Sequence, residues 1–170
     1  MRRFLMMVLA LVVALACAAH AETAAPAQVG ALAPDFEVET LGGEPFRLSD
    51  CRGKVVLLNI WATWCPPCVS EMPDIQALSE AYPEDLVVIG VSVDESRDEV
   101  EAFIAENGYT YNFAMDPGFQ ISGMLYPTYY IPNSVFIDPK GIVASIDVGA
   151  ANYNALEARF LSILADARGE

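Results

Sequence analysis

The chain has 170 residues, of which 54% are hydrophobic and 19% are charged, and its formal net charge at pH 7 is −14. This length and composition predict one globular domain with a core large enough to be stable without disulfide staples. The strong negative charge excludes nucleic acid as an expected partner, because phosphate binding needs an excess of Lys and Arg.

The N-terminal segment has the pattern of an export signal. Two arginines at positions 2 and 3 precede an uncharged apolar run over residues 4–19, and the tripeptide Ala-His-Ala at 19–21 matches a cleavage site. We therefore expect residues 1–21 to be a signal peptide and the protein to be periplasmic or otherwise extracytoplasmic. A permanent anchor is the weaker alternative, since the run is shorter than the roughly 20 residues that span a bilayer. Lipidation at Cys17 is a further alternative, although the preceding residues match the lipoprotein motif only loosely.

Cleavage after residue 21 would also restrict the available chemistry. It removes two of the nine basic residues and none of the 23 acidic ones, which leaves a net charge of −16. It removes His20, the only histidine, so we expect neither Ser-His or Cys-His catalysis nor a His-rich zinc site. Three cysteines remain, Cys51, Cys65 and Cys68. An odd number argues against a fixed disulfide framework and indicates one functional pair, Cys65 and Cys68, with Cys51 as the spare.

The first half of the mature chain predicts a tether, a hairpin and two buried strands. The Ala/Pro-rich residues 22–29 are expected to be a flexible tether, and the domain is expected over residues 30–168. Short segments at 36–39 and 46–48 flank two glycines and predict a β-hairpin. Val- and Ile-rich runs at 55–60 and 86–93 predict buried strands, because each is too short for an independent helix.

Three helices and a second hairpin are predicted around these strands. Residues 66–81 are expected to be a helix that starts with two prolines and is kinked at Pro73. Ser96 and Glu99 match a capping box for a helix that ends before Gly108. A turn at 138–141 predicts a hairpin of segments 134–138 and 142–148, and helical spacing from 153 to 164 predicts the closing helix. The expected fold is α/β, with strands sandwiched by helices.

The predicted strand at 55–60 leads directly into a pair of cysteines at the start of the next helix. The free N–H groups and the positive dipole end of that helix stabilise a thiolate, so Cys65 is expected to be the nucleophile. Cys68 lies one turn further on and can resolve a mixed disulfide. A metal-binding pair is an alternative. Two thiolates form only half of a closed zinc site, so the metal that such a pair could bind is two-coordinate copper. Two cysteines that merely pack are the other alternative.

The sequence resembles the TlpA/ResA/CcmG (DsbE) branch of exported thioredoxin-fold thiol–disulfide oxidoreductases, within the redoxin and AhpC/TSA-like superfamily. The resemblance covers about residues 30–165 and implies a thioredoxin-like three-layer α/β/α sandwich with an N-terminal β-hairpin and a central β-α insertion. The stretches that carry it are Ala33-Pro34-Asp35-Phe36, Leu48-Ser49-Asp50, Gly53-Lys54-Val55-Val56-Leu57-Leu58-Asn59, Trp61-Ala62-Thr63-Trp64-Cys65 and Phe136-Ile137-Asp138.

The resemblance also implies a proton carrier beside the cysteines. A glutamate at the spacing of Glu71 is typical near the active site of this branch, and its place in the helix puts it on roughly the same face as the pair. It would take and return the proton of Cys68. Asn59 stands where ordinary thioredoxins carry a buried aspartate, which favours Glu71 as the proton shuttle. A solvated helix glutamate is the alternative.

The expected substrate contacts flank the cysteines and a later proline. Pro132 is the expected cis-proline, in preference to Pro127, and with Ile131 it would present backbone groups to an extended substrate. Trp64 is expected to be a lid on the site, whereas Trp61 is expected in the core. Pro66 and Pro67 would contact the substrate and help to set the pKa of the cysteines. Three tyrosines line a groove there or pack in the core: Tyr126, Tyr129 and Tyr130.

The expected function is reduction of protein disulfides, such as those of apocytochrome c or of copper-assembly proteins, by a monomer without cofactor or metal. A membrane thiol donor would return the electrons, and the absence of the histidine of strongly oxidising relatives favours reduction. A peroxiredoxin-like peroxidase is one alternative, although no Thr or Ser precedes either cysteine by three residues. Delivery of Cu(I) is the other. Cys51 is expected to be a buried free thiol, with a regulatory bond to Cys65 as its alternative.

Overall fold

The computed structural model describes residues 25–94 and 96–169. The expected signal peptide at 1–21 and the first residues of the expected tether lie outside this range. Residues 25–29 form no helix or strand, and the backbone N–H of Ala27 donates to the carbonyl of Leu125 at 2.8 Å. No helix within the described residues is long and apolar enough to cross a membrane.

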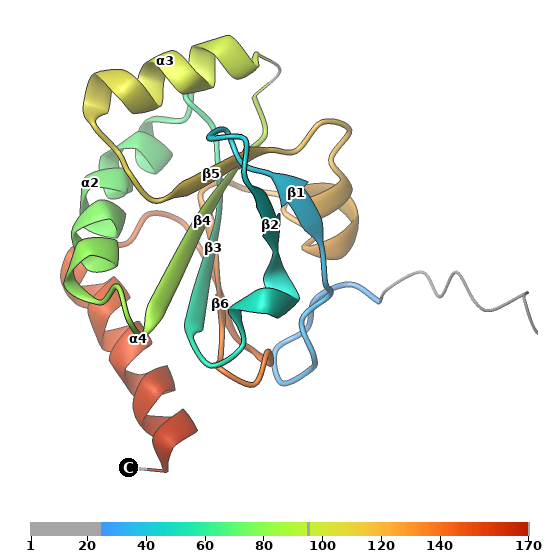
Figure 1. Cartoon of the computed structure of the whole chain (residues 1–170), viewed down its shortest axis with the longest axis vertical. Coiled ribbons are helices and arrows are strands. Elements are labelled where there is room, and N and C mark those ends of the chain that lie inside the picture. Colours follow the sequence, from blue (N-terminus) through green and yellow to red (C-terminus); the bar gives the residue numbers. More distant parts are fainter. Residues whose placement is uncertain (1–24, 95, 170) are drawn as a thin grey trace, which may run out of the picture.

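A five-stranded sheet in the order β5-β4-β3-β6-β7 forms the centre of the molecule (Figure 1). Strands β3, β4 and β5 are parallel to one another, and β6 and β7 are antiparallel to their neighbours. All residues of the central strand β3 are buried, because both faces of the sheet are covered, which explains the unbroken apolar run in its sequence. The strands are β3 (Val55–Trp61), β4 (Leu86–Ser92), β5 (Asn112–Met115), β6 (Asn133–Ile137) and β7 (Val143–Val148).

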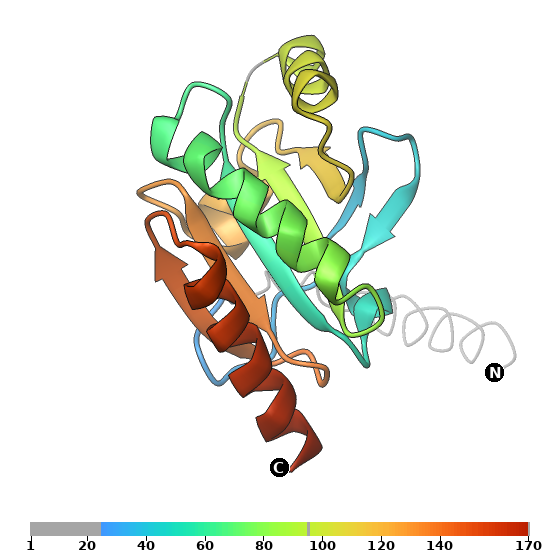
Figure 2. The same ribbon diagram turned by 90° about the vertical axis from the view of Figure 1, so that its left-hand side faces the viewer.

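Helices cover one face of this sheet. Figure 2 shows α2 (Pro66–Ala81) and α4 (Tyr153–Arg168) side by side across it. The helix α3 (Arg97–Asn107) connects β4 to β5 and adds Val100 to the same hydrophobic cluster. This cluster joins side chains of α2 and α4 to alternate residues of β3, as expected for a helix layer packed on a strand of period two.

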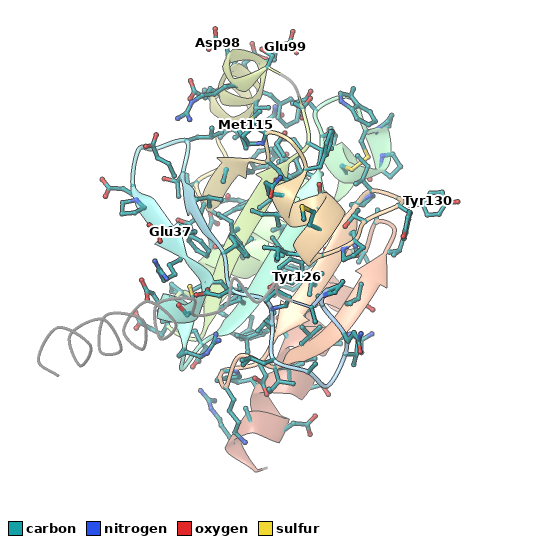
Figure 3. The ribbon with its side chains drawn as sticks, turned by 90° about the vertical axis from the view of Figure 1, so that its right-hand side faces the viewer. Glu37, Asp98, Glu99, Met115, Tyr126 and Tyr130 are labelled. Carbon is teal, nitrogen blue, oxygen red and sulfur yellow. A yellow bond between two sulfur atoms is a disulfide. The ribbon has the colours of Figure 1, made fainter. Side chains whose placement is uncertain are left out.

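The opposite face is covered by a small hairpin and short helical turns, seen from that side in Figure 3. Strands β1 (Glu37–Glu39) and β2 (Pro45–Arg47) form the hairpin, which continues into the 3-10 helix η1 (Leu48–Cys51). The π-helix η2 (Gln120–Leu125) completes this layer. A second hydrophobic cluster lies beneath them against the sheet. The predicted α/β sandwich is therefore confirmed.

Most element boundaries agree with the sequence predictions. The helix α2 spans the predicted residues and contains Pro73 within it. At the start of α3, the hydroxyl of Ser96 accepts a hydrogen bond from the backbone N–H of Glu99 at 3.3 Å, and Gly108 ends the helix with a φ of 72°. Three short elements were not predicted from the sequence: β5, η1 and η2. Strand β5 has only four residues of mixed polarity, and η1 and η2 have four and six residues, too few to show a helical period.

Candidate active site

Two cysteines lie where β3 passes into α2. Cys65 is the N-cap residue of the helix, and its sulfur lies 3.3 Å from the donating backbone N–H of Cys68. The first two helical positions are Pro66 and Pro67, which have no N–H, so among the first three helical residues only Cys68 can donate to that sulfur. Cys65 and Cys68 form a disulfide with their Cα atoms 5.3 Å apart. The strand-to-helix connection thus produces the predicted dithiol pair.

Accessibility differs between the two sulfur-bearing residues. Cys68 is completely buried and Cys65 is 4% exposed, whereas the neighbouring Trp64 is 67% exposed. The two prolines between the cysteines are also exposed. An incoming thiolate or disulfide therefore meets Cys65 first, which agrees with its expected role as the nucleophile. Trp61, at the end of β3, is completely buried, as predicted for a core residue.

The loop before β6 faces the disulfide. The Ile131–Pro132 peptide bond is cis, and the carbonyl oxygen of Ile131 lies 3.7 Å from the sulfur of Cys65. Tyr130 is exposed and points into solvent (Figure 3). Tyr126 packs in the core, because it is buried and its hydroxyl donates to the carbonyl of Pro34 at 2.7 Å. The polypeptide at the exposed side of this loop is thus available to an extended substrate next to Cys65.

Glu71 is a buried carboxylate on α2, one turn after Cys68. Its side chain is 1% exposed, so the alternative of a solvated helix glutamate is wrong. Oε1 accepts a hydrogen bond from Nδ2 of Asn59 at 2.7 Å, and Oε2 accepts one from the backbone N–H of Ala151 at 3.0 Å. Burial raises the pKa of Glu71 above its ordinary value, and the charge of Asp74 adds to this, whereas the two hydrogen bonds oppose it. A carboxyl group with a raised pKa holds a proton more readily than an ordinary glutamate and can later return it.

A second polar cluster fixes the turn before the cysteines, and the sequence analysis did not identify it. The carboxylate of Asp94 accepts hydrogen bonds from the backbone N–H of Thr63 at 2.9 Å and from its hydroxyl at 2.6 Å. The hydroxyl of Ser92 donates to the same carboxylate at 2.6 Å. Asp94 follows the end of β4, and the carboxyl ends of parallel strands meet at one edge of a sheet. That topology was the available signal for placing Asp94 beside the residues that follow β3.

Cys51 lies at the other end of β3, just before the strand begins, and is half-buried. Burial and the nearby Asp50 raise the pKa of its thiol, so it is a poor thiolate. The seven-residue strand separates it from Cys65 by roughly 20 Å. The alternative of a regulatory bond between these two residues within the folded chain is therefore wrong. Cys51 is also less buried than the free thiol that the sequence predicted.

Within residues 25–94 and 96–169, no group of three or more His, Cys, Asp or Glu side chains is arranged to hold a metal ion. The chemistry that this site offers is thiol–disulfide exchange. One cysteine is reachable, its partner is buried within bonding distance, and a carboxyl group of raised pKa lies one helical turn beyond that partner.

Comparisons with known proteins agree with this geometry. The model of the AhpC/TSA family matches residues 29–146. The chain is 39% identical over 136 residues to the thioredoxin-like protein YneN of Bacillus subtilis, covering 76% of this chain and 77% of that protein. It is 38% identical over 135 residues to the thiol-disulfide oxidoreductase ResA of Oceanobacillus iheyensis, covering 76% of this chain and 70% of that protein.

A solved structure shows the same fold. It is a protein from Chlorobium tepidum assigned as the thiol:disulfide interchange protein DsbE, which superposes with a TM-score of 0.75 at 31% sequence identity. The match covers 81% of this chain and 99% of that protein.

Proposed function

The chain belongs to the AhpC/TSA family and is a thiol–disulfide oxidoreductase of the ResA/DsbE type, and from this premise we propose that it reduces protein disulfides outside the cytoplasm. One observation carries the proposal: Cys65 caps the N-terminus of α2 beside the carbonyl of Ile131, with Cys68 buried behind it. Glu71, buried one turn further along the helix, supplies the proton acceptor that such a pair needs.

The reaction proceeds in two exchanges. In the reduced protein the thiolate of Cys65 attacks one sulfur of the substrate disulfide, forms a mixed disulfide and releases the first substrate thiolate. Cys68 then gives its proton to Glu71 and attacks the sulfur of Cys65. The second substrate thiolate leaves, and the Cys65–Cys68 disulfide forms. Two electrons have passed from the protein to the substrate, which ends as a dithiol once its thiolates take up protons from solvent.

We propose that the substrate lies as an extended peptide between the helix start and the cis-proline loop. Trp64, Pro66 and Pro67 are exposed on one side of Cys65, and the Ile131–Pro132 segment lies on the other. Backbone groups of such a loop can pair with an extended chain in the manner of an added strand. Trp64 would close over the reacting sulfur atoms and exclude water from them.

The proposed setting is the extracytoplasmic side of a membrane. The arginine pair, the apolar run and the Ala-His-Ala site of residues 1–21 support export. The proposed substrates are the haem-binding cysteines of apocytochrome c or the cysteines of copper-assembly proteins. A membrane thiol donor would reduce the disulfide again after each turnover, and the protein would act as a monomer.

The reduction potential of the Cys65–Cys68 couple tests the direction of the reaction. The mature protein is equilibrated in defined thiol buffers and its free thiols are quantified, with the Cys51→Ala variant as a control for the spare cysteine. A potential near or below about −270 mV supports a reductase. A value near −120 mV is that of a strong oxidant and would contradict the proposal.

A disulfide-bonded peptide with the sequence Cys-x-x-Cys-His tests the substrate class. We expect the reduced protein to reduce this peptide at least about tenfold faster than a scrambled peptide that has the same disulfide loop, since contacts beyond the reacting sulfur atoms add selectivity. Equal rates for both peptides would contradict a preference for apocytochrome c.

A further inference from the structure

A row of polar side chains crosses the sheet from the buried carboxyl group of Glu71 to the edge of the molecule. In the strand register, Asn59 of β3 pairs with Ser134 of β6, and Ser134 pairs with Asp147 of β7. Directly paired residues of antiparallel strands point to the same face, here the one beneath α2 and α4. Nδ2 of Asn59 donates to Glu71 at 2.7 Å and to the hydroxyl of Ser134 at 3.1 Å. The row therefore joins the proposed proton carrier to a strand at the sheet edge.

A cavity of about 210 Å³ lies beside this row, between β6, β7 and the start of α4, the region at the edge of the sheet in Figure 2. It is large enough for several water molecules, each of which takes about 30 Å³ in the liquid. Ser134 and Ala151 both line it. Ser134 contacts Asn59, and the N–H of Ala151 donates to Glu71 at 3.0 Å. Ser134 and Ala151 thus link the hydrogen bonds of Glu71 and Asn59 to the wall of the cavity.

The cavity has a charged rim. Asp147 and Arg159 also line it, and they form an ion pair of 3.1 Å with both side chains partly exposed to solvent. The hydroxyl of Ser145 donates to the same aspartate at 2.7 Å. At the buried end, Oδ1 of Asn59 receives no hydrogen bond from any residue that the structure describes. Because buried polar atoms are nearly always paired with protein or ordered water, this atom indicates water within the network.

Each catalytic cycle requires Glu71 to release a proton to solvent. Glu71 is 1% exposed, and in the mixed disulfide the substrate covers the side of the molecule on which Cys65 is reached. The proton that Glu71 takes from Cys68 must still leave before the next cycle. We propose that the cavity between β6, β7 and α4 is the path by which Glu71 exchanges this proton with solvent, and that Ser134 is a positioning residue that holds Asn59 in place on this path. The inference rests on the proposed role of Glu71 in the function above.

Several other titratable groups face this network. Cys68 and Asp74 lie on the same helix as Glu71, and Asp74 helps to raise the pKa of Glu71. The buried Tyr111 precedes β5, and its pKa is raised mainly by burial and in part by the charge of Glu71. Asp147 and Arg159 at the rim are paired with each other. Asp74 and the rim pair are all partly exposed, but of these groups only Asp147 and Arg159 line the cavity that Ser134 and Ala151 reach.

The direct test narrows the cavity without touching the cysteines. Ala155→Leu places a larger side chain over the cavity, whereas Ala158→Leu makes the same change on the exposed surface of the same helix, away from the cavity lining. Steady-state turnover is followed with insulin as a protein disulfide and with oxidised glutathione as a small one, at a reductant concentration that does not limit the rate. We expect Ala155→Leu to slow turnover with insulin about tenfold, part of the roughly 10²–10⁴-fold that proton transfer contributes to such reactions.

The same variant should show a larger solvent deuterium isotope effect than wild type, because departure of the proton becomes rate-limiting. With oxidised glutathione the loss should be smaller, since a small adduct leaves the Cys65 side open to water. Ala158→Leu should match wild type with both disulfides. Equal rates for Ala155→Leu and Ala158→Leu with insulin would overturn the proposal.

Ser134→Ala supplies a second, independent variant. We expect it to shift the pH profile of turnover, and Ser134→Thr, which keeps a hydroxyl, to restore the wild-type profile at an unchanged melting temperature. Glu71→Gln distinguishes failure of the proposed role of Glu71 from failure of the proposed proton route. If it leaves the pH profile unchanged, Glu71 carries no proton and its proposed role fails. If it alters the profile while the cavity and Ser134 variants do not, only the route is wrong.

Discussion

Strand β3 has a cysteine near each of its ends, and the two thiols lie in opposite chemical settings. Cys51 sits in a short 3-10 helix, and burial together with Asp50 raises its pKa. Cys65 caps a sixteen-residue α-helix, where a backbone N–H is directed at its sulfur. Cys51 is the more exposed of the two, so exposure alone would select the wrong residue. The backbone around the sulfur, rather than its accessibility, decides which cysteine is reactive.

The largest expected effect is at Cys65. Replacing it with Ser should reduce disulfide reductase activity by about 10³-fold or more, because loss of a nucleophile removes the whole covalent path. Insulin reduction with dithiothreitol as electron donor measures this loss. Cys68→Ser is the matched variant: it should still attack the substrate but accumulate a mixed disulfide, visible as a covalent adduct by mass spectrometry. Activity retained in Cys65→Ser would mean that the other end of the strand is the reactive one.

The buried carboxyl group of Glu71 lies near the Cys65 end of β3, and it should make the free energy of unfolding depend on pH. The folded protein binds the proton of Glu71 more tightly than the unfolded chain does, because burial raises its pKa above 4.5. The free energy of unfolding should therefore fall as the pH rises from that value through the raised pKa, by about 1.4 kcal/mol for each tenfold difference in proton affinity.

Urea denaturation of wild type and Glu71→Gln, carried out from about pH 5 to 8, measures this dependence. The variant should give a flatter curve over this range. Parallel curves for both proteins would contradict the raised pKa.

Asp94 supports the turn at the Cys65 end of β3 through three hydrogen bonds. Asp94→Ala leaves two buried or half-buried donors of Thr63 and the hydroxyl of Ser92 without their acceptor. We expect a loss of about 1–3 kcal/mol in the free energy of unfolding and a smaller loss of activity than at Cys65. Thermal denaturation with Asp98→Ala as control checks this, because Asp98 is exposed on α3 and should change stability by less than about 1 kcal/mol.

The smallest effect is expected at Cys51. Replacing this half-buried thiol with Ala should leave the activity and the reduction potential unchanged and lower the free energy of unfolding by less than about 1.5 kcal/mol. Competitive labelling of the reduced protein with iodoacetamide checks the contrast directly, since Cys65 should be modified well before Cys51. Faster labelling of Cys51 than of Cys65 would contradict the assignment of Cys65 as the more reactive thiol.

The sequence predicted the parts of the site that are local in the chain. The run from Trp61 to Cys68 identified the strand end, the cap and the cysteine pair, and Ser96 and Gly108 marked the limits of a helix. Of the contacts between distant segments, the sequence predicted the approach of Ile131 and Pro132 to the cysteines, through the family resemblance, but not the contacts of Asp94 or of Glu71 with Ala151. Asp94 meets Thr63 only because β4 lies beside β3, and Glu71 meets Ala151 only because α4 starts beside α2. The tyrosines before Pro132 show the same limit, since Tyr126 is buried whereas Tyr129 and Tyr130 are exposed.

The prolines at the start of α2 have a consequence for the electron-donating strength of the protein. A helix N-terminus usually offers several N–H groups to an anion, and here two of the first three are missing. When the disulfide opens, the new Cys65 thiolate gains less stabilisation than it would in a pair separated by ordinary residues. A dithiol whose reduced form is strongly stabilised is a good electron acceptor, and this pair lacks part of that stabilisation. The missing donors therefore favour giving electrons away.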